Sequence, residues 1–361
     1  MKVLILTTDY PNLEGDIPAF FIHVRSMFYK ENGIELDVLS FNAKSDYIID
    51  GINVITLATY KKIEKYYDVL ILHAPNLRNH YMFLKKFGKR FEKHLYFFHG
   101  HEILKINKDY PKPYKYMRKK LNILQDIYDF IKLKIWHYYF IRNNRKSYYI
   151  FVSNWMKEMF LKNLKINEKI ITKNAFITYN SIGEKFETNN YDKKQKKIYD
   201  FITIRSNLDE SKYSIDIVNK LAYKNSDKKF LLIGKGKFFD FFDKAPNITL
   251  IEKNCNHKEI ISFLNKSKCA LMPTRTDSQG LMACEMATFG IPLITSNIEI
   301  CYEIFSEFEN VDYINNDEIE TEDIVDKYNS ISVHETKKNE KYFSKNTCQN
   351  EIKILEKILD K

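Results

Sequence analysis

Two carboxylates stand close together in the segment PTRTDSQGLMACEMATFGIPLITS, which runs from Pro273 to Ser296. The apolar residues before it predict a strand that ends at Pro273, and a polar loop with Arg275 and Asp277 follows. Glu285 comes eight positions after Asp277, near the start of a predicted helix. Because an ionised carboxylate accepts hydrogen bonds from two hydroxyls at once, the pair can bind two parts of one polyol, and a vicinal diol such as ribose suits it. The pair therefore predicts a site for a ligand with several hydroxyl groups.

The turn into the helix favours an anion. Gly280 lets the chain turn into a helix predicted over Gln279–Thr288, with Leu281 in its first turn. The free N–H groups and the dipole at a helix N-terminus attract negative charge, so we expect Gly280 and Leu281 to contact the ligand. The alternative is an ordinary strand, loop and helix in which Asp277 is a cap and Glu285 is solvated.

Two basic side chains follow the strand predicted over Asp200–Ile204. Arg205 comes directly after this strand, and Lys212 stands seven positions later. A phosphate leaving group needs positive charge near it, and an arginine fork with a lysine point charge supplies that charge. Arg205 and Lys212 therefore predict a diphosphate site. The alternative is that both are surface cations on a chain rich in lysine.

The acidic segment resembles the signature of the family-4 retaining glycosyltransferases of the GT-B fold (glycosyl transferases group 1), PS-x-x-EGFG-x-x-x-x-E-A followed by G-x-P. The matching positions are Pro273, Thr274, Asp277, Gly280, Glu285, Gly290 and Pro292. The resemblance implies that Glu285 holds the nucleotide ribose and that Asp277 contacts the donor sugar. Asp277 replaces the usual glutamate and shortens the reach by one methylene, which bears on donor identity more than on the fold.

Further elements resemble the same family. Arg205 and Lys212 resemble its GR…KG element, which implies that they hold the donor diphosphate, although isoleucine and tyrosine replace the two glycines. Gly234 opens the run GKGK, which is similar to the family's G-x-G turn after a strand and lacks the GxxxxGK[ST] pattern of a P-loop. The resemblance implies that Gly234 contacts the nucleotide sugar. Glu14-Gly15-Asp16 resembles the glycine-rich first loop, with Gly15 its only glycine, and a plain turn before a helix explains it equally well.

One histidine is expected beside the donor sugar. The run His99-Gly100-His101-Glu102 ends an apolar strand and resembles the family's HG-x-D/E element. A neutral imidazole there donates or accepts one hydrogen bond near the reaction centre. The resemblance implies His99, and His101 competes for the same role.

The length of 361 residues suits two domains. Short apolar runs alternate with longer amphipathic ones in both halves, which predicts parallel sheets. We therefore expect an α/β protein of the GT-B type, with two Rossmann-like doubly wound domains facing each other across a cleft. The expected parts are an acceptor-binding domain over 1–182, a linker over 183–199, a nucleotide-sugar-binding domain over 200–340, and a C-terminal helix over 341–361 that docks toward the first domain.

The net charge of +10 is concentrated in the first half. Residues 1–180 carry 30 basic and 17 acidic side chains, and Lys105–Lys146 alone carries 12 and 3. The aromatic, basic stretch Tyr114–Asn143, predicted as a helix, either lies on an anionic membrane or packs on the first domain with a solvated basic face. The five cysteines show no metal spacing and are expected to be reduced in a cytosolic protein, peripheral on the inner membrane face if the basic stretch binds lipid.

Together these features predict a metal-independent, retaining glycosyltransferase of bacterial surface polysaccharide assembly. Its donor substrate would be a nucleoside-diphosphate sugar, with no separate cofactor, and its acceptor a glycan or a lipid-linked glycan. One alternative is a sugar-nucleotide epimerase on the same fold, which would release free sugar products without an acceptor. A non-catalytic nucleic-acid-binding protein is suggested by net charge alone, and the absence of clustered arginines and base-stacking motifs argues against it.

Overall fold

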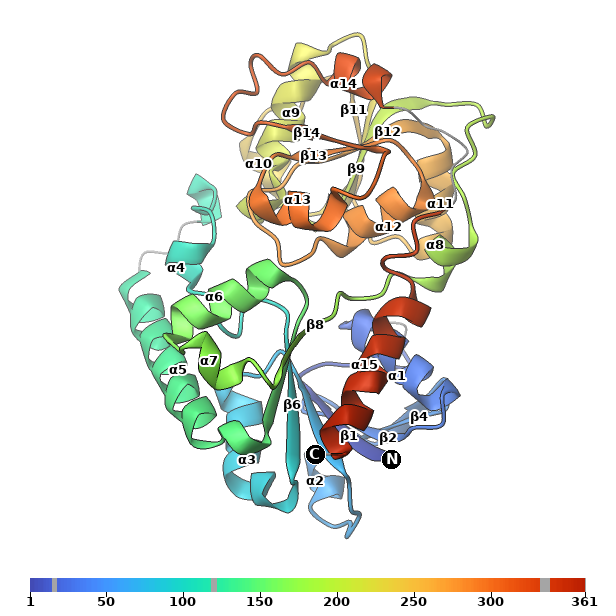
Figure 1. Cartoon of the computed structure of the whole chain (residues 1–361). Coiled ribbons are helices and arrows are strands. Elements are labelled where there is room, and N and C mark those ends of the chain that lie inside the picture. Colours follow the sequence, from blue (N-terminus) through green and yellow to red (C-terminus); the bar gives the residue numbers. More distant parts are fainter. Residues whose placement is uncertain (15–17, 118–121, 332–337, 361) are drawn as a thin grey trace. The chain divides into compact units, whose positions relative to one another are not determined.

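The computed structural model describes residues 1–14, 18–117, 122–331 and 338–360 (Figure 1). Its contacts divide the chain into two compact units. The first unit comprises Met1–Ile106, Leu124–Ser181 and Tyr342–Lys361, and the second comprises Asn107–Ile123 and Ile182–Lys341. Each unit contains one sheet, and each is described by itself below.

The sheet of the first unit has the order β3-β4-β2-β1-β5-β6-β7-β8, and all neighbours are parallel except β3 and β4. Its strands are β1 (Lys2–Thr7), β2 (Glu35–Ser40), β3 (Tyr47–Ile49), β4 (Ile52–Ile55), β5 (Val69–His73), β6 (Lys93–Phe98), β7 (Ser147–Phe151) and β8 (Ala175–Ile177). Its helices are α1 (Phe20–Glu31), α2 (Leu57–Tyr60), a π-helical turn (Leu77–Tyr81), α3 (Met82–Phe87), α5 (Asn122–Arg142), α6 (Asn154–Leu164), α7 (Glu168–Ile171) and α15 (Ser344–Leu359), while α4 (Ile106–Asp109) begins at the boundary of the units.

Both faces of this sheet are covered, which explains why its strands are nearly continuous apolar runs. Alternate residues of a strand point to opposite faces. In β6, Leu95 and Phe97 join the cluster that includes Ile22 of α1 and Leu355 of α15. Phe98 points the other way, and its ring centroid lies 6.0 Å from that of Phe140 on α5. Figure 1 accordingly shows α5 and α6 on one side of the sheet and α1 and α15 on the other.

The C-terminal helix is held to the first unit by a buried charge cluster. The Nε of Arg25 donates to Glu351 at 3.0 Å, and both side chains are fully buried. Tyr29 also donates to Glu351, at 2.5 Å, and Arg25 Nη2 donates to Asn180 at 2.8 Å. Separating α15 from α1 would leave Arg25 and Glu351 as buried charges without partners, which would strongly destabilise the fold. These bonds therefore hold α15 against α1.

The sheet of the second unit is wholly parallel in the order β11-β10-β9-β12-β13-β14. Its strands are β9 (Tyr199–Asn207), β10 (Phe230–Lys235), β11 (Ile248–Ile251), β12 (Ser267–Met272), β13 (Leu293–Ser296) and β14 (Val311–Ile314). Its α-helices are α8 (Glu184–Thr188), α9 (Ile215–Lys224), α10 (Phe238–Phe241), α11 (His257–Asn265), α12 (Leu281–Phe289), α13 (Glu299–Phe305) and α14 (Ile324–Ser330). The strand order reverses between β9 and β12, and ligands of such sheets bind at the carboxyl ends of the strands at that switch point.

The stretch expected to form one helix over Tyr114–Asn143 divides differently. The described part of the helix is α5, Asn122–Arg142, and the described residues before it include a short 3₁₀ turn at Lys115–Met117. Residues 107–117 belong to the second unit, where Tyr114 joins the apolar cluster around α9 and β10. The prediction of a continuous helix is therefore wrong at its start, because aromatic side chains that suit a helix face here fill a tertiary contact instead.

The expected linker over 183–199 lies within the second unit. It begins with α8, which packs against α12. The ring of Phe186 on α8 lies 5.2 Å from that of His257 and 6.0 Å from that of Phe289. Phe186 is fully buried, so this segment packs on the second unit through its apolar side chain. The polar residues that suggested a linker lie on its exposed side.

Candidate functional site

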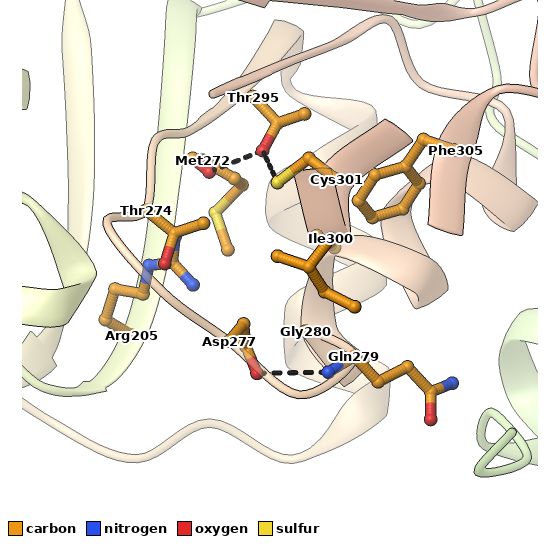
Figure 2. Close-up of a pocket in the computed structure, with 11 residues that line it drawn as sticks. Arg205, Met272, Thr274, Asp277, Gln279, Gly280, Thr295, Ile300, Cys301 and Phe305 are labelled. Atoms are coloured by element: carbon orange, nitrogen blue, oxygen red, sulfur yellow. Dashed lines mark hydrogen bonds between the residues drawn. The ribbon is translucent and has the colours of Figure 1, made fainter. Parts of the chain in front are cut away.

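A pocket lies at the switch point of the second unit, at the carboxyl ends of β9, β12 and β13 (Figure 2). Its cavity volume is about 10 Å³, which is room for roughly one water molecule. Polar groups line one part of it and apolar side chains the rest. The lining residues are Arg205, Met272, Thr274, Asp277, Gln279, Gly280, Ala283, Thr295, Ile300, Cys301 and Phe305. The structure therefore brings Arg205, Asp277 and Gly280 together, as expected for parts of one site.

A β-bulge next to Gly234 directs Arg205. Ile204 pairs with Ile233, and the next pair is Asn207 with Lys235, so two residues of β9 oppose the single residue Gly234. A Cβ on Gly234 would lie 2.2 Å from the carbonyl oxygen of Arg205. Only glycine fits there, and bulges of this kind re-aim side chains beside functional sites. Gly234, predicted as a ligand contact, thus shapes the backbone under Arg205.

Arg205 is buried and only partly satisfied. Its Nη2 donates to the carbonyl of Pro273 at 2.8 Å, and its guanidinium carbon lies 4.9 Å from the centroid of the Tyr213 ring. Its Nε is buried without a partner in the described structure. Burial lowers the pKa of Arg205, and the charge of Asp277 opposes this effect. A buried, incompletely paired guanidinium at the edge of a pocket is suited to an anionic ligand.

Lys212 lies in a loop that is fastened to the start of the Asp277 loop. The carbonyl of Lys212 accepts from the backbone N–H of Arg275 and from the hydroxyl of Thr274, both at 2.9 Å. The ammonium of Lys212 pairs with Glu210 at 2.9 Å. Burial alone would lower the pKa of Lys212, but Tyr213, Glu210 and Asp277 outweigh it, and the pKa is raised. Lys212 is therefore a charged lysine whose backbone is held beside the pocket, although its side chain is not among the lining residues.

Arg275, noted in the sequence without a role, holds these two loops together. Its Nη1 and Nη2 donate to the two carboxylate oxygens of Asp216 at 2.8 and 2.7 Å. Its Nη1 also donates to the carbonyl of Ser211 at 2.9 Å. The hydrogen bonds and the charge of Arg275 outweigh burial and lower the pKa of Asp216. Only the tertiary fold reveals this bidentate pair, because its partners lie 59 positions apart.

Asp277 and the first turn of α12 share one wall of the pocket (Figure 2). Asp277 Oδ1 accepts from the backbone N–H groups of Ser278 at 2.7 Å and of Gln279 at 3.3 Å. Gly280 precedes the helix at φ 75°, a left-handed conformation that favours glycine. No side chain caps α12, whose first residue is Leu281. Its first N–H groups thus remain a donor set for a ligand oxygen.

Glu285 lies apart from that pocket. Its Oε1 accepts from the backbone N–H of Gly183 at 3.1 Å and lies 3.5 Å from Nε2 of His257. Its side chain is buried, which raises its pKa to about 7 against the lowering effect of the Gly183 bond. The expectation of a solvated Glu285 is excluded. The carboxylate instead anchors the residue before α8, and it titrates near neutrality.

His99 lies in the first unit, after β6. Its Nε2 is 3.2 Å from Nδ1 of His73, which ends β5, and its ring centroid is 4.6 Å from that of Phe21. Burial and the nearby Arg25 hold the pKa of His99 well below its usual value, so the ring is neutral at pH 7. The backbone N–H groups of His99 and Gly100 donate to the Glu102 carboxylate. Sequence reasoning did not find His73, whose one signal is its position at a strand end.

The two remaining predicted site residues are His101 and Gly15. His101, the competitor of His99, is exposed, and its carbonyl accepts from Lys132 at 3.1 Å. Gly15, expected in the first loop, lies outside the described residues.

The described ranges contain no group of three His, Cys, Asp or Glu side chains that could hold a metal ion. Within them, too, every helix is too short or too polar to cross a membrane.

Comparison with known sequences matches residues 184–349 to the family model described as glycosyl transferases group 1. A stretch of 102 residues is 29% identical to an O-antigen biosynthesis glycosyltransferase, WclY of Escherichia coli. This stretch spans 26% of the chain and only 28% of the length of that relative.

Solved structures resemble the whole chain at low sequence identity. Sucrose-phosphate synthase from Thermosynechococcus elongatus has a TM-score of 0.70 at 10% identity, with 99% of both chains covered. A glycosyltransferase from Rickettsia africae ESF-5 has a TM-score of 0.69 at 14% identity, covering 99% of this chain and 98% of its own. A variant of S. aureus TarM in complex with fondaparinux, α-GlcNAc-glycerol and UDP has a TM-score of 0.65 at 12% identity, with 100% of both chains covered. The chain therefore has the GT-B fold of two parallel-sheet α/β domains, and its residues 184–349 match the glycosyl transferases group 1 family.

Proposed function

We propose that this protein is a glycosyltransferase that moves a sugar from a nucleoside-diphosphate sugar to an acceptor hydroxyl, with retention of configuration. The observation that carries the proposal is the pocket at the β9/β12 switch point, where Arg205, Asp277 and the uncapped start of α12 meet within the family-matched domain. The second unit binds the donor in this account, and the first unit binds the acceptor.

The proposed roles follow from charge and position. In the transfer, the bond between the anomeric carbon and the diphosphate oxygen breaks, a bond to the acceptor oxygen forms, and the proton of the acceptor hydroxyl passes to the departing diphosphate. Negative charge grows on the departing diphosphate, and Arg205, Lys212 and the N-terminus of α12 stabilise it. Asp277 accepts hydrogen bonds from hydroxyls of the sugar, and Glu285 from those of the ribose. The role of His99 beside the sugar stays a prediction.

Two relatives support the choice of substrates. The TarM variant carries UDP in its solved complex, and the E. coli relative is an O-antigen biosynthesis enzyme. We propose accordingly that the donor is a nucleoside-diphosphate sugar and that the acceptor is a glycan or lipid-linked glycan of bacterial surface polysaccharide. An epimerase would convert the donor without an acceptor, so a product that contains the acceptor separates the two functions.

We expect turnover without a divalent metal. Two cationic side chains and a helix N-terminus supply positive charge for the diphosphate, which is the task a metal performs in other transferases. With the donor and acceptor that the protein uses, product formation should continue in excess EDTA. Complete loss of product in EDTA, with recovery on addition of Mn²⁺ or Mg²⁺, would contradict this expectation.

The outer side of α5 supports a contact between the first unit and an anionic membrane. Asp129 and Lys132 turn inward and pair at 2.8 Å, while Lys134 and Arg142 stay exposed. The large apolar side chains left exposed on this helix are Ile123, Leu124, Ile127, Tyr128, Phe130, Ile131, Tyr138 and Ile141. A helix with exposed apolar side chains among cations suits the surface of an anionic membrane. Its apolar side chains would insert between the lipids, and its cations would contact the lipid phosphates.

The double variant Phe130→Ser/Ile131→Ser should therefore bind vesicles of anionic lipid about ten-fold more weakly than the parent protein, since two side chains no longer insert. Binding should also weaken as salt rises, because exposed charges are screened within ~10 Å at 0.1 M. Co-sedimentation with anionic and neutral vesicles measures both effects. Tyr223→Ser is the matched control, an equally exposed aromatic residue on α9 of the second unit. Equal recovery with both kinds of vesicle would remove the membrane contact from the account.

A further inference from the structure

Two tyrosines from the first half of the sequence hold the loop that carries Lys212. We call residues 110–116 the strap and residues 207–216 the cation loop. The hydroxyl of Tyr116 donates to Asp209 at 2.7 Å, near one end of the cation loop. The hydroxyl of Tyr114 donates to Asp216 at 2.8 Å, at the other end. Lys212 lies between these two attachment points.

The strap is itself fixed by ring packing in the second unit. The ring of Tyr116 stacks on that of Phe241 at 4.2 Å with an angle of 8° between the planes. Tyr114 is 9% exposed, and its ring meets that of Phe238 edge-on at 4.9 Å. Since packed rings cannot shift without losing these contacts, the two hydroxyls are presented to the cation loop at fixed positions.

One of the two bonds connects to Lys212 through Arg275, and the other fixes the loop three residues before Lys212. Asp216, which accepts from Tyr114, also receives the fork of Arg275, and the backbone N–H of Arg275 donates to the carbonyl of Lys212 at 2.9 Å. On the other side, Asp209 Oδ1 also accepts from the backbone N–H of Lys237 at 2.8 Å. The ammonium of Lys212 lies 5.9 Å from the centroid of the Tyr110 ring, so the strap also borders the charged group itself.

We infer that the strap is a positioning element for the diphosphate of the donor, acting through the cation loop on Lys212. This inference rests on the proposed function, in which Lys212 binds the diphosphate of the donor. A cation held in place binds phosphate without first losing conformational freedom, whereas a cation on a loose loop pays that entropy on binding. The tyrosines touch Asp209 and Asp216 and not the pocket, so they are positioning residues.

The experiment compares two ligands on four proteins by calorimetry. The ligands are the nucleoside diphosphate that binds the wild-type protein most tightly and its monophosphate, and the proteins are wild type, Tyr114→Phe/Tyr116→Phe, Lys212→Met and the triple variant. The dissociation constant of the monophosphate divided by that of the diphosphate reports how much the second phosphate contributes to binding. The strap variant should reduce this ratio about ten-fold, which equals ~1.4 kcal/mol. In the Lys212→Met background the strap substitutions should change the ratio no further, because both act on one cation.

The matched control is Tyr191→Phe, which removes a hydroxyl that donates to the carbonyl of Ser267 at 2.7 Å, at the amino end of β12. It should lower the melting temperature without changing the ratio.

If the double variant does not fold, each single strap variant is tested in the same way. A wild-type ratio in the strap variants, or an equal further loss on top of Lys212→Met, would overturn the inference while leaving the proposed function standing. Failure of the wild-type protein to bind any nucleoside diphosphate would overturn both.

Discussion

Replacing Arg205 with Met should lower kcat/KM by about 10²–10³-fold, or ~2.7–4 kcal/mol, as for other preorganised groups that stabilise developing negative charge. The side chain is 7% exposed, and its Nε has no partner in the described structure, so the fold keeps donor capacity free in the pocket. Met fills a similar volume without charge, which separates the loss of charge from the loss of packing. Steady-state kinetics with the cognate donor and acceptor measure the effect.

Two further variants sharpen this test. Gly234→Ala should reproduce part of the loss, because its Cβ would lie 2.2 Å from the carbonyl oxygen of Arg205 and displace the bulge. Lys268→Met is the matched control: it removes a cation that pairs with Asp200 at 2.8 Å, near the amino end of β12. The control should keep its kcat/KM. A near-wild-type rate for Arg205→Met would show that Arg205 takes no part in the transfer.

The central strands could be predicted from the sequence because burial on both faces makes them continuous apolar runs. The apolar runs Lys2–Thr7 and Glu35–Ser40, for example, form β1 and β2. The strands without a sequence signal are β3, β8 and β14, which have three or four residues and lie at sheet edges. An edge strand needs only a few half-buried residues, and so short a pattern does not stand out from a loop.

The parts of the candidate site that are formed by residues close together in the sequence could be predicted. Asp277 and Gly280 stand in a loop between a strand and a helix, and parallel strands bring Arg205 to the same sheet edge. The supporting contacts were not predictable, because they join distant positions. Tyr114 and Asp216 are 102 positions apart, and the aromatic pattern around Tyr114 suggested a helix. Only the fold shows that this tyrosine packs against the second unit.

The two carboxylates of the acidic segment have different surroundings, so their variants should fail in different ways. Every nucleoside diphosphate carries the ribose, with or without its sugar. Glu285→Gln should therefore weaken binding of both the full donor and the bare nucleotide, by about 1.5–3 kcal/mol for a lost hydrogen bond to a charged group. The glutamine amide oxygen can still accept from Gly183, which preserves the structural bond. Asp277→Asn should weaken the full donor, or its turnover, and leave the bare nucleotide nearly unchanged.

The pH dependence provides a second readout for Glu285. Its pKa of about 7 means that the carboxyl is mainly protonated below that pH and mainly charged above it. A charged carboxylate is the stronger acceptor for hydroxyls, so affinity for the nucleoside-diphosphate sugar, whose diphosphate has no terminal phosphate that titrates in this range, should fall as the pH is lowered through about 7. Glu285→Gln should remove this dependence, since the amide does not titrate in that range.

Calorimetry of a nucleoside-diphosphate sugar and its bare nucleotide on the wild-type protein, Glu285→Gln and Asp277→Asn decides whether the two carboxylates bind the donor. Circular dichroism first establishes that each variant is folded. We expect that the wild-type protein binds both ligands, that Glu285→Gln weakens both, and that Asp277→Asn weakens the sugar nucleotide selectively. If both variants bind both ligands like the wild-type protein, Glu285 only anchors Gly183, Asp277 only shapes its loop, and the donor site is not where this account places it.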